Sequence, residues 1–236
     1  AGAAPPPFIS DSELDPVLSY LRAHGEVREI LLSGGDPLTA DDQTLERLFS
    51  ALRDARPGIL LRVCTRAPTV HPLRLDDRCV ALLRRWRPLR MVVHVNHPAE
   101  LESPAADRLA ACVDAGIPVH TQTVLLAGVN DHAPTLAELF TRCVDLGMSP
   151  CYLFQIDLTP GTAHFRVPLR RGLEIYDELK PLVSGLALPK YAVDLPGGGG
   201  KILLHQGIIA GEEARPEGPV YLLRGNDGRL WPYPAE

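Results

Sequence analysis

The sequence predicts an α/β fold in which short buried strands alternate with helices. Strand-like apolar runs recur about every 30 residues, which is the size of a βαβ crossover unit. Between these runs, apolar residues are spaced as they are on one face of a helix. Because the runs are apolar throughout, the strands are expected to be parallel and to be covered on both faces. Periodicity alone leaves a barrel and an open doubly wound sheet equally compatible with the pattern.

Six strands and several helices can be placed along the chain. The strands are predicted at 29–32, 59–63, 91–95, 118–125, 151–156 and 191–193. Two helices are predicted from the apolar series Leu45, Leu48, Leu52 and Leu136, Leu139, Cys143, Leu146. Short polar side chains are expected to cap the first two helices, Asp11 with Ser12 and Asp41 with Asp42. Gly116 and Gly147 are expected to end two later helices in the left-handed conformation.

The composition excludes several classes of protein. The chain has 236 residues, of which 45% are hydrophobic and 22% charged, as in a globular protein of one or two domains. A net charge of −5 provides no basic field for nucleic acid, and no apolar run approaches the ~18 residues of a membrane span. The five cysteines are an odd number without a C-x-x-C pair, which indicates reduced thiols in a cytoplasmic protein.

Polar clusters follow each of the predicted strands. They are SGGD at 33–36, TRAP at 65–68, HVNHP at 94–98, QT at 122–123 with GVND at 128–131, QID at 155–157, and DLPGGGGK at 194–201. The carboxyl ends of parallel strands are the places where α/β folds build their active sites. Six such placements in one chain predict an enzyme.

Lys201 ends a run of four glycines, and it is one of only three lysines in the chain. The run is not a phosphate-binding P-loop, because that motif needs glycine at 195 and Ser or Thr at 202, where the chain has Leu195 and Ile202. A lysine held in a pocket at a strand end can form a Schiff base with an aldehyde cofactor. The alternative interpretation is a flexible surface loop that carries a solvated lysine.

Two aspartates end neighbouring predicted strands, so their carboxylates could converge. Without an arginine beside them, paired carboxylates such as Asp157 and Asp194 suit a cationic ligand, for example an ammonium group. The alternative is that each aspartate caps the turn that follows it.

The SGGD and HVNHP clusters also have two interpretations each. The two glycines of SGGD allow the backbone to approach a ligand's amine and carboxylate, with Asp36 as a charged acceptor, but a capped tight turn has the same sequence. His94 and Asn96 share one strand face. No C-x-x-C or H-E-x-x-H spacing supports zinc, so no metal ligand is assigned in this chain.

Seven motifs occur in a specific order: LLSGGDPL, TRAPTVHPLRL, VVHVNHPAEL, TQTVLLAGVND, FQIDLTPGTAHFRVPL, SGLALP and AVDLPGGGGK. In this order the chain resembles the lysine 2,3-aminomutase family, which are pyridoxal-phosphate-dependent members of the radical SAM superfamily. The resemblance implies a partial (β/α)6-type radical SAM barrel with parallel strands and outer helices, in which the first strand and the cluster loop are missing from the chain. It further implies a barrel core at 1–205 and a C-terminal extension at 206–236.

The resemblance also implies roles for individual residues. Lys201 would hold pyridoxal phosphate covalently, and Ser33 and Gln122 would contact it. Asp157 and Asp194 would bind the distal ammonium of the substrate. The residues implied for S-adenosylmethionine are Ser33, Gly34, Gly35, Asp36, His94, Asn96 and Gln122.

The implied reaction moves the α-amino group of L-lysine to the β-carbon, giving β-lysine, through a pyridoxal-phosphate aldimine and a 5′-deoxyadenosyl radical. The implied cofactors are pyridoxal 5′-phosphate, S-adenosyl-L-methionine and a 4Fe-4S cluster. The implied partners are an amino acid substrate and an electron donor such as flavodoxin or ferredoxin, and a homo-oligomer is left open. Because glutamate-acting relatives have non-acidic residues at the two aspartate positions, Asp157 and Asp194 favour a cationic side chain.

The chain departs from the family in several places. The cluster motif C-x-x-x-C-x-x-C is absent and is expected upstream of Ala1, so the 236 residues alone are expected to be an inactive fragment. Cys151 and Phe154 stand where the family commonly has tyrosines. Three alternatives stay open: an aminomutase for arginine or another cationic amino acid, a non-radical enzyme with an aldolase-type Schiff base, and a cluster-less remnant that binds pyridoxal phosphate or a partner in a regulatory role.

Overall fold

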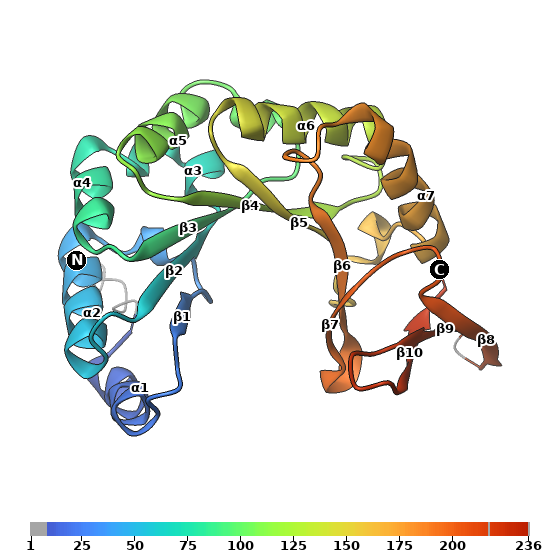
Figure 1. Ribbon diagram of the computed structural model, residues 1–236, viewed down its shortest axis with the longest axis horizontal. Helices are drawn as coiled ribbons and strands as arrows, with labels where there is room; N and C mark the ends of the chain where they lie inside the picture. Colours follow the sequence, from blue (N-terminus) through green and yellow to red (C-terminus); the bar gives the residue numbers. More distant parts are fainter. Residues whose placement is uncertain (1–8, 217, 236) are drawn as a thin grey trace, which may run out of the picture. The chain divides into compact units, whose positions relative to one another are not determined.

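The computed structural model describes residues 9–216 and 218–235 of the chain, which divide into two units. The first unit takes in the described residues up to 94 together with 102–120 and 146–148, and the second takes in 95–101, 121–145 and the described residues from 149 onward. The strands of the main sheet, β1 to β7, follow the order of the chain, and β8, β9 and β10 form a separate sheet (Figure 1).

The first unit contains parallel strands covered by helices. Its strands are β1 (Glu29–Leu32), β2 (Leu60–Thr65) and β3 (Leu89–His94), which pair in parallel with Glu29 opposite Leu60 and Leu61 opposite Leu89. Its helices are α1 (Asp11–Ala23), α2 (Asp42–Ala55), α3 (Ala67–Val70), α4 (Asp77–Arg85) and α5 (Ala105–Asp114), with short 3-10 turns η1 (Pro37–Thr39) and η2 (Pro72–Arg74). Helices α2, α4 and α5 lie on the same face of the strands (Figure 1), and their buried leucines supply the core there.

The second unit carries the rest of the main sheet and the small sheet. Strand β4 (Val119–Leu125) begins in the first unit and continues here, followed by β5 (Ser149–Gln155), β6 (Lys190–Leu195) and β7 (Gly200–Leu203). Strand β5 pairs with β6 in parallel, and β6 pairs with β7 in antiparallel orientation. The helices are α6 (Ala133–Asp145) and α7 (Leu169–Leu179), with 3-10 turns η3 (Pro98–Leu101), η4 (Ala163–Phe165), η5 (Lys180–Leu182) and η6 (Pro196–Gly198). The small antiparallel sheet consists of β8 (Ile209–Arg215), β9 (Gly218–Arg224) and β10 (Leu230–Pro234).

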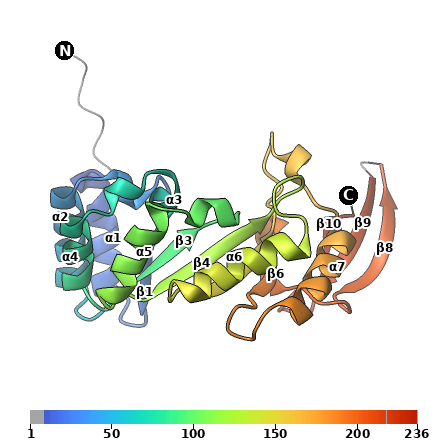
Figure 2. The same ribbon diagram turned by 90° about the horizontal axis from the view of Figure 1, so that it is seen from above.

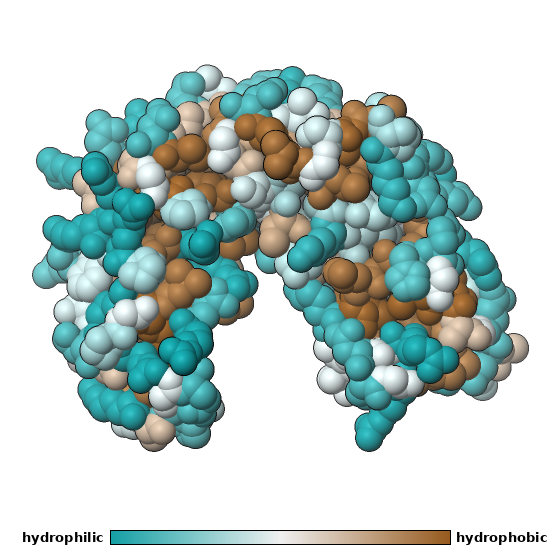
Figure 3. Space-filling view, in the orientation of Figure 1, coloured by the Kyte–Doolittle hydropathy of each residue, from teal (hydrophilic) through white to brown (hydrophobic). Residues whose placement is uncertain are grey.

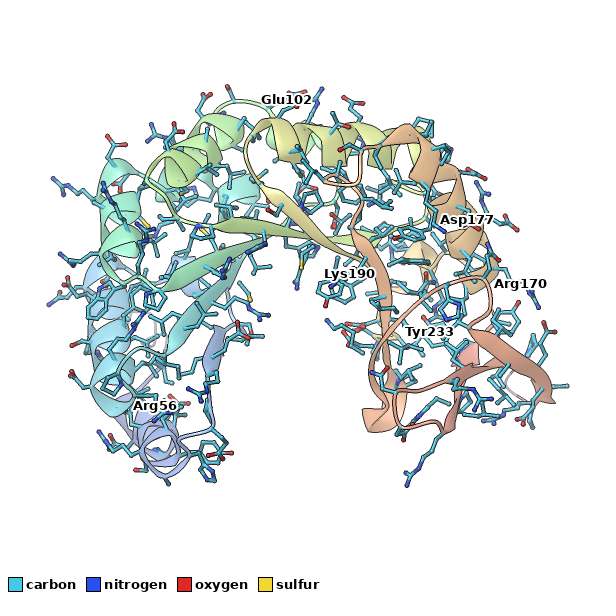
Figure 4. All side chains as sticks on the ribbon, viewed as in Figure 1. Arg56, Glu102, Arg170, Asp177, Lys190 and Tyr233 are labelled. Atoms are coloured by element: carbon cyan, nitrogen blue, oxygen red, sulfur yellow. The ribbon has the colours of Figure 1, made fainter. Side chains whose placement is uncertain are left out.

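Helix α7 connects β5 to β6 and contacts the small sheet of the second unit. One side of the helix is buried through Leu169, Leu173, Ile175 and Leu179. The other side carries arginines and glutamates, so the surface over α7 is polar in Figure 3. Seen from above, the small sheet lies beside this helix (Figure 2). At the start of α7, Arg170 lies next to the small sheet (Figure 4), donates a hydrogen bond of 2.9 Å to the Tyr221 hydroxyl and forms an ion pair with Glu212.

Most of the predicted elements are confirmed, and two expectations are wrong. All six predicted strands are present within a few residues of their expected bounds, and Gly116 and Gly147 have φ of 76° and 73°. The expected cover on both faces is wrong for β2 and β4, in which buried residues alternate with half-buried ones. Strand β7, which was not predicted, adds an antiparallel edge strand beside β6. The first helix is capped by Ser10, whose reciprocal bonds with Glu13 start the helix one residue before the expected cap.

The small sheet was not predicted, and it begins at Ile209. The division of the chain at 205 into a core and an extension remains a prediction. Among the described residues, no helix has both the length and the apolar sequence that a membrane crossing requires.

In the first unit, Asp36 connects the end of β1 to the end of β2. One carboxylate oxygen accepts hydrogen bonds from the Leu38 amide (3.0 Å) and the Thr65 hydroxyl (2.6 Å). The other accepts from the amides of Arg66 (2.6 Å) and Ala67 (3.0 Å). This carboxylate therefore accepts hydrogen bonds from four protein donors, and it connects the loops that follow β1 and β2.

Replacing Asp36 by Asn should destabilise the protein, because an amide offers one acceptor oxygen where the carboxylate uses two. The expected loss is about 1–3 kcal/mol in the free energy of unfolding, since part-buried and exposed donors lose hydrogen bonds to a charged acceptor. Urea denaturation of the variant measures it.

Asp41→Asn is the matched control. Asp41 caps α2 through a single bond from the Thr44 amide (2.7 Å), and asparagine caps helices about as well as aspartate. Equal stabilities of the two variants would show that the four-bond network around Asp36 is not formed.

Candidate active site

A pocket of about 260 Å³ lies at the carboxyl ends of the strands in the second unit. It is lined by Gln122 and Val124 of β4, Phe154 and Gln155 of β5, Asp157 just beyond β5, Asp194 of β6 and Lys201 of β7. The pocket thus brings together the two aspartates and the lysine that the sequence analysis singled out. This volume is slightly below the range of about 300–1,000 Å³ that is typical of ligand pockets.

The β6–β7 hairpin places Lys201 directly opposite Asp194. The two residues are partners in the antiparallel register, with Val193 opposite Ile202 and Leu195 opposite Gly200. The Lys201 ammonium lies 3.7 Å from an Asp194 carboxylate oxygen, and the side chains remain 36% and 51% exposed. An ion pair as solvated as this one contributes little to stability, so its main effect is on where the amine lies.

Two aromatic rings of β5 lie beneath the amine of Lys201. Its nitrogen is 4.1 Å from the centre of the Phe154 ring and 4.7 Å from the centre of the Tyr152 ring. The rings stack on each other at 5.1 Å, which makes a continuous aromatic surface on that face of β5. A cation at these distances is attracted to the ring faces, and the amine is therefore held between a carboxylate and an aromatic surface.

The charges of the pocket are unbalanced, with two carboxylates and one ammonium. Partial desolvation raises the pKa of Asp157 above its usual value, and the neighbouring Asp194 carboxylate raises it further, while the Lys201 ammonium acts in the opposite direction. A second cation entering the pocket would relieve the repulsion between the two acids. The electrostatics therefore favour a positively charged ligand over an anionic one.

Each glycine of the run is required by the backbone or by packing. Gly197, Gly198 and Gly200 have φ of 71°, 89° and 73°, in the left-handed region that other residues avoid. A side-chain carbon on Gly199 would lie 2.7 Å from Cβ of Leu195 and 2.8 Å from the Trp231 ring. The run is thus a tight turn with a packed neighbour, which argues against the alternative of a flexible surface loop.

Gln155 lines the pocket but is engaged in the core. Its amide nitrogen donates to the Val167 carbonyl, and its oxygen accepts from the buried Tyr191 hydroxyl. Burial raises the pKa of Tyr191, so this phenol stays a donor at all ordinary pH values. Gln122 is half-buried at the pocket wall.

The other predicted residues are divided between the two units. Ser33, Gly34 and Gly35 form an exposed loop of the first unit, where Gly34 and Gly35 have φ of 83° and 55°. His94 ends β3 in the same unit and is half-buried. Asp36 already accepts four hydrogen bonds from the protein, and its contact with a ligand remains a prediction.

Asn96 belongs to the second unit, where it is buried and fixes a loop. Its side-chain oxygen accepts from the Val124 amide (2.9 Å), and its backbone carbonyl accepts from the Asn130 amide (2.8 Å). Asn130 also donates to the Val124 carbonyl and accepts from Leu126. This network holds the HVNHP and GVND segments against β4, and a ligand contact for Asn96 remains a prediction.

Three residues near Lys201 were missed by the sequence analysis: Tyr152, Asn226 and Trp231. Tyr152 could have been found from alternation, because it lies two residues from Phe154 and so on the same face of a strand. Asn226 and Trp231 come from the small sheet, for which no signal was recognised. Across residues 9–216 and 218–235, no three His, Cys, Asp or Glu side chains converge as metal ligands.

The pKa of Asp157 should respond to each of its two charged neighbours. Asp194→Asn removes a negative charge and should lower this pKa, while Lys201→Met removes a positive charge and should raise it. Carbon-13 NMR titration of labelled aspartate carboxyls measures both shifts. Glu178→Gln, on the exposed side of α7, is the control and should leave the Asp157 pKa unchanged.

The same shift sets a direction for stability. Since the folded state holds the proton on Asp157 more tightly than the unfolded chain does, the stability from this group falls as pH rises through the folded pKa. The difference in stability between Asp157→Asn and the parent should therefore shift in favour of the variant as pH rises from acid to neutral.

In the NMR titration, an unchanged Asp157 pKa in Asp194→Asn would contradict the close approach of the two acids.

The chain is similar in sequence to a group of curated aminomutases, although no family profile matches it. It is 45% identical over 232 residues to a protein of Treponema pallidum whose assignment as an L-lysine 2,3-aminomutase is provisional, covering 96% of this chain and 64% of that protein. It is 36% identical to the L-lysine 2,3-aminomutase of Bacillus subtilis, covering 96% of this chain and 47% of that enzyme. A glutamate 2,3-aminomutase of Clostridioides difficile is 34% identical over 194 residues, covering 82% of this chain and 46% of that enzyme. The chain thus spans about half to two thirds of the length of these relatives.

Solved structures show the fold. A radical SAM methyltransferase from Sphaerobacter thermophilus superposes with a TM-score of 0.57 at 18% identity, covering 77% of this chain and 57% of that one. The protein anSMEcpe, solved with bound AdoMet, gives a TM-score of 0.57 at 11% identity, covering 73% of this chain and 51% of that one. The fold is therefore the partial (β/α) barrel seen in radical SAM proteins, and in sequence the chain is similar to lysine 2,3-aminomutases over about half to two thirds of their length.

Proposed function

We propose that this chain acts in an aminomutase that moves the α-amino group of L-lysine to the β-carbon, giving β-lysine. The observation that carries the proposal is the pocket in which the Lys201 amine lies beside Asp194 and near Asp157. The names of the sequence relatives support the substrate. The two carboxylates support it independently, because a lysine substrate brings a second ammonium group to a pocket with excess negative charge.

The residues of this pocket fit the aldehyde end of pyridoxal phosphate. Lys180 is paired with Asp177 at 2.5 Å on the surface of α7, and Lys190 lies exposed at the start of β6 (Figure 4). Lys201 alone among the three lysines lines the pocket. Its backbone is fixed by the β6–β7 pairing, so a cofactor bound to this amine would have a defined position.

When bound, pyridoxal phosphate supplies an imine π-system that stabilises an adjacent radical during nitrogen migration. The chain's own residues would bind and orient the substrate. Asp157 and Asp194 would hold the distal ammonium of lysine by charge-assisted hydrogen bonds. The apolar faces of Phe154 and Val124 would exclude water from that side of the pocket, and the Gln122 amide would supply a neutral hydrogen-bonding group at the wall.

Glutamate is disfavoured as a substrate by charge. Its side-chain carboxylate would be a third negative group beside Asp157, whose pKa already reflects repulsion by Asp194. Arginine or another cationic amino acid satisfies the same carboxylates and remains the second candidate substrate.

S-adenosylmethionine is proposed to bind at the SGGD loop of the first unit. Ser33, Gly34 and Gly35 are exposed there, and a side-chain carbon on Gly34 would meet nothing within 4 Å, so a ligand can approach the backbone. The chemistry supplied by this cofactor is a hydrogen-abstracting 5′-deoxyadenosyl radical. Asp36 supports the loop from behind through its four hydrogen bonds.

The five cysteines of the chain do not fit a 4Fe-4S cluster. Cys79, Cys112 and Cys143 are buried in the helical layer, and burial raises the pKa of their thiols to about 11, 12 and 12. Cys64 and Cys151 lie in different strands and units. No reaction step is therefore assigned to a cluster bound by the described residues, and a role as a cluster-less pyridoxal-phosphate-binding subunit is the second candidate function.

Incubation with pyridoxal phosphate followed by borohydride reduction should attach the cofactor to Lys201. The reason is that this amine alone among the three lysines lies in a pocket with aromatic and acidic walls. Peptide mapping by mass spectrometry locates the label, and the expected result is a single modified peptide that contains residue 201.

Lys190→Arg and Lys201→Arg form the matched pair of controls. The first should keep full labelling and the second should lose it. Label found mainly on Lys180 or Lys190 of the parent would refute the proposed cofactor site.

A further inference from the structure

The turn between β9 and β10, residues 225–229, contacts the backbone of Lys201. The side-chain amide of Asn226 donates a hydrogen bond of 2.8 Å to the backbone carbonyl of Lys201 itself. The turn is closed by its own bonds, from the Gly225 amide to the Arg229 carbonyl (2.8 Å) and from the Arg229 amide to the Asp227 side chain (3.0 Å). Asn226 therefore presents its donor from a well-defined loop.

Trp231 of β10 packs between the glycine run and the β9–β10 turn. A side-chain carbon on Gly199 would lie 2.8 Å from its ring, and one on Gly225 would lie 2.6 Å from its indole nitrogen. The indole N–H donates to Asp227 at 3.3 Å, which fixes the ring relative to the turn. The indole thus touches the glycine run on one side and the β9–β10 turn on the other.

These contacts matter because β7 is weakly held by the main sheet alone. The strand has four residues, stands last in the sheet and pairs only with β6 among the described strands. Its first residue follows three glycines, which lose more conformational freedom on folding than other residues do. A short edge strand of this kind frays readily unless other groups fix it.

We propose that Asn226 and Trp231 are positioning residues for Lys201, which hold its backbone so that its amine stays over Phe154 and Tyr152 and beside Asp194. The meaning of this arrangement for catalysis rests on the proposed function. The placement itself does not require a bound cofactor and can be measured without one.

The small number of lysines makes a direct test practical. Reductive methylation with carbon-13 formaldehyde labels the three lysines and the α-amino group, and it keeps each lysine positively charged. Because the Lys201 nitrogen is 4.1 and 4.7 Å from two ring centres, ring currents should displace its methyl signal from that of Lys190. The displacement should exceed that of Lys180, whose nitrogen lies 5.1 Å from the centre of one ring, that of Tyr176. Lys201→Arg assigns the signal by removing it.

Asn226→Asp is the sharpest variant, since it keeps the shape of the side chain and removes the donor. The Lys201 methyl signal should move toward the position of a solvated lysine. Asn226→Gln, which retains an amide donor, should restore part of the displacement. Tyr176→Phe is the matched control, because it also removes a 2.8 Å bond to a backbone carbonyl, that of Pro189, and it should leave the signal in place.

Trp231→Phe provides a second variant of the same contact, and it should shift the signal in the same direction as Asn226→Asp. A parent Lys201 signal without ring-current displacement would overturn the proposal. So would a signal that Asn226→Asp and Trp231→Phe leave unchanged.

Pyridoxal phosphate binding separates this inference from the proposed function. Loss of one hydrogen bond worth about 1 kcal/mol should weaken cofactor binding at Lys201 about fivefold in Asn226→Asp. A parent that shows the displaced signal but no labelling at Lys201 would refute the proposed function and keep the positioning role. A parent that is labelled at Lys201, with equal affinity in Asn226→Asp, would refute the positioning role and keep the function.

Discussion

Antiparallel pairing of β6 with β7 decides what the pocket contains. Side chains alternate between the two faces of a strand, so a slip of one residue would replace Lys201 by Ile202 or Gly200 opposite Asp194. The turn that sets this register uses three left-handed glycines and a fourth that has no room for a side chain. Such a turn is costly in conformational entropy. The cost is explained if Lys201, which follows the turn, has to lie at one place.

The pocket combines weak interactions that act on the same amine. The Asp194 carboxylate attracts it at 3.7 Å in a partly solvated setting, and the two stacked rings attract it from below. Neither contact stabilises the fold strongly. Together they restrict the amine to one side of a small cavity, while Asp157 adds a negative charge that the single lysine does not neutralise. This excess of negative charge is the physical basis for selecting a cationic amino acid.

The sequence predicted the parallel βα repeat well, because apolar runs such as ILLRV at 59–63 and MVVHV at 91–95 leave a clear signal. It also drew attention to Lys201, Asp157 and Asp194, since each follows or ends a predicted strand. It did not predict that β2 buries one face only, since Arg62 and its neighbours on the other face are half-buried. It could not predict that Asp36 is saturated, because the donors at Thr65, Arg66 and Ala67 are supplied by a neighbouring strand some 30 residues away in the chain. Nor could it predict β7, whose glycine-rich start has low strand propensity, or the contact of Trp231 with Gly199, which depends on a second sheet.

Cross-linking of positions 194 and 201 tests the β6–β7 register most directly. The double variant Asp194→Cys with Lys201→Cys places two thiols at opposed positions, where adjacent strands bring side chains close enough for a disulfide. Mild oxidation should give a 194–201 bond in high yield, found by peptide mapping, and the pair Asp194→Cys with Ile202→Cys should give little, because residues 201 and 202 point to opposite faces. A 194–202 bond that forms as readily as 194–201, or the absence of both, would contradict the account.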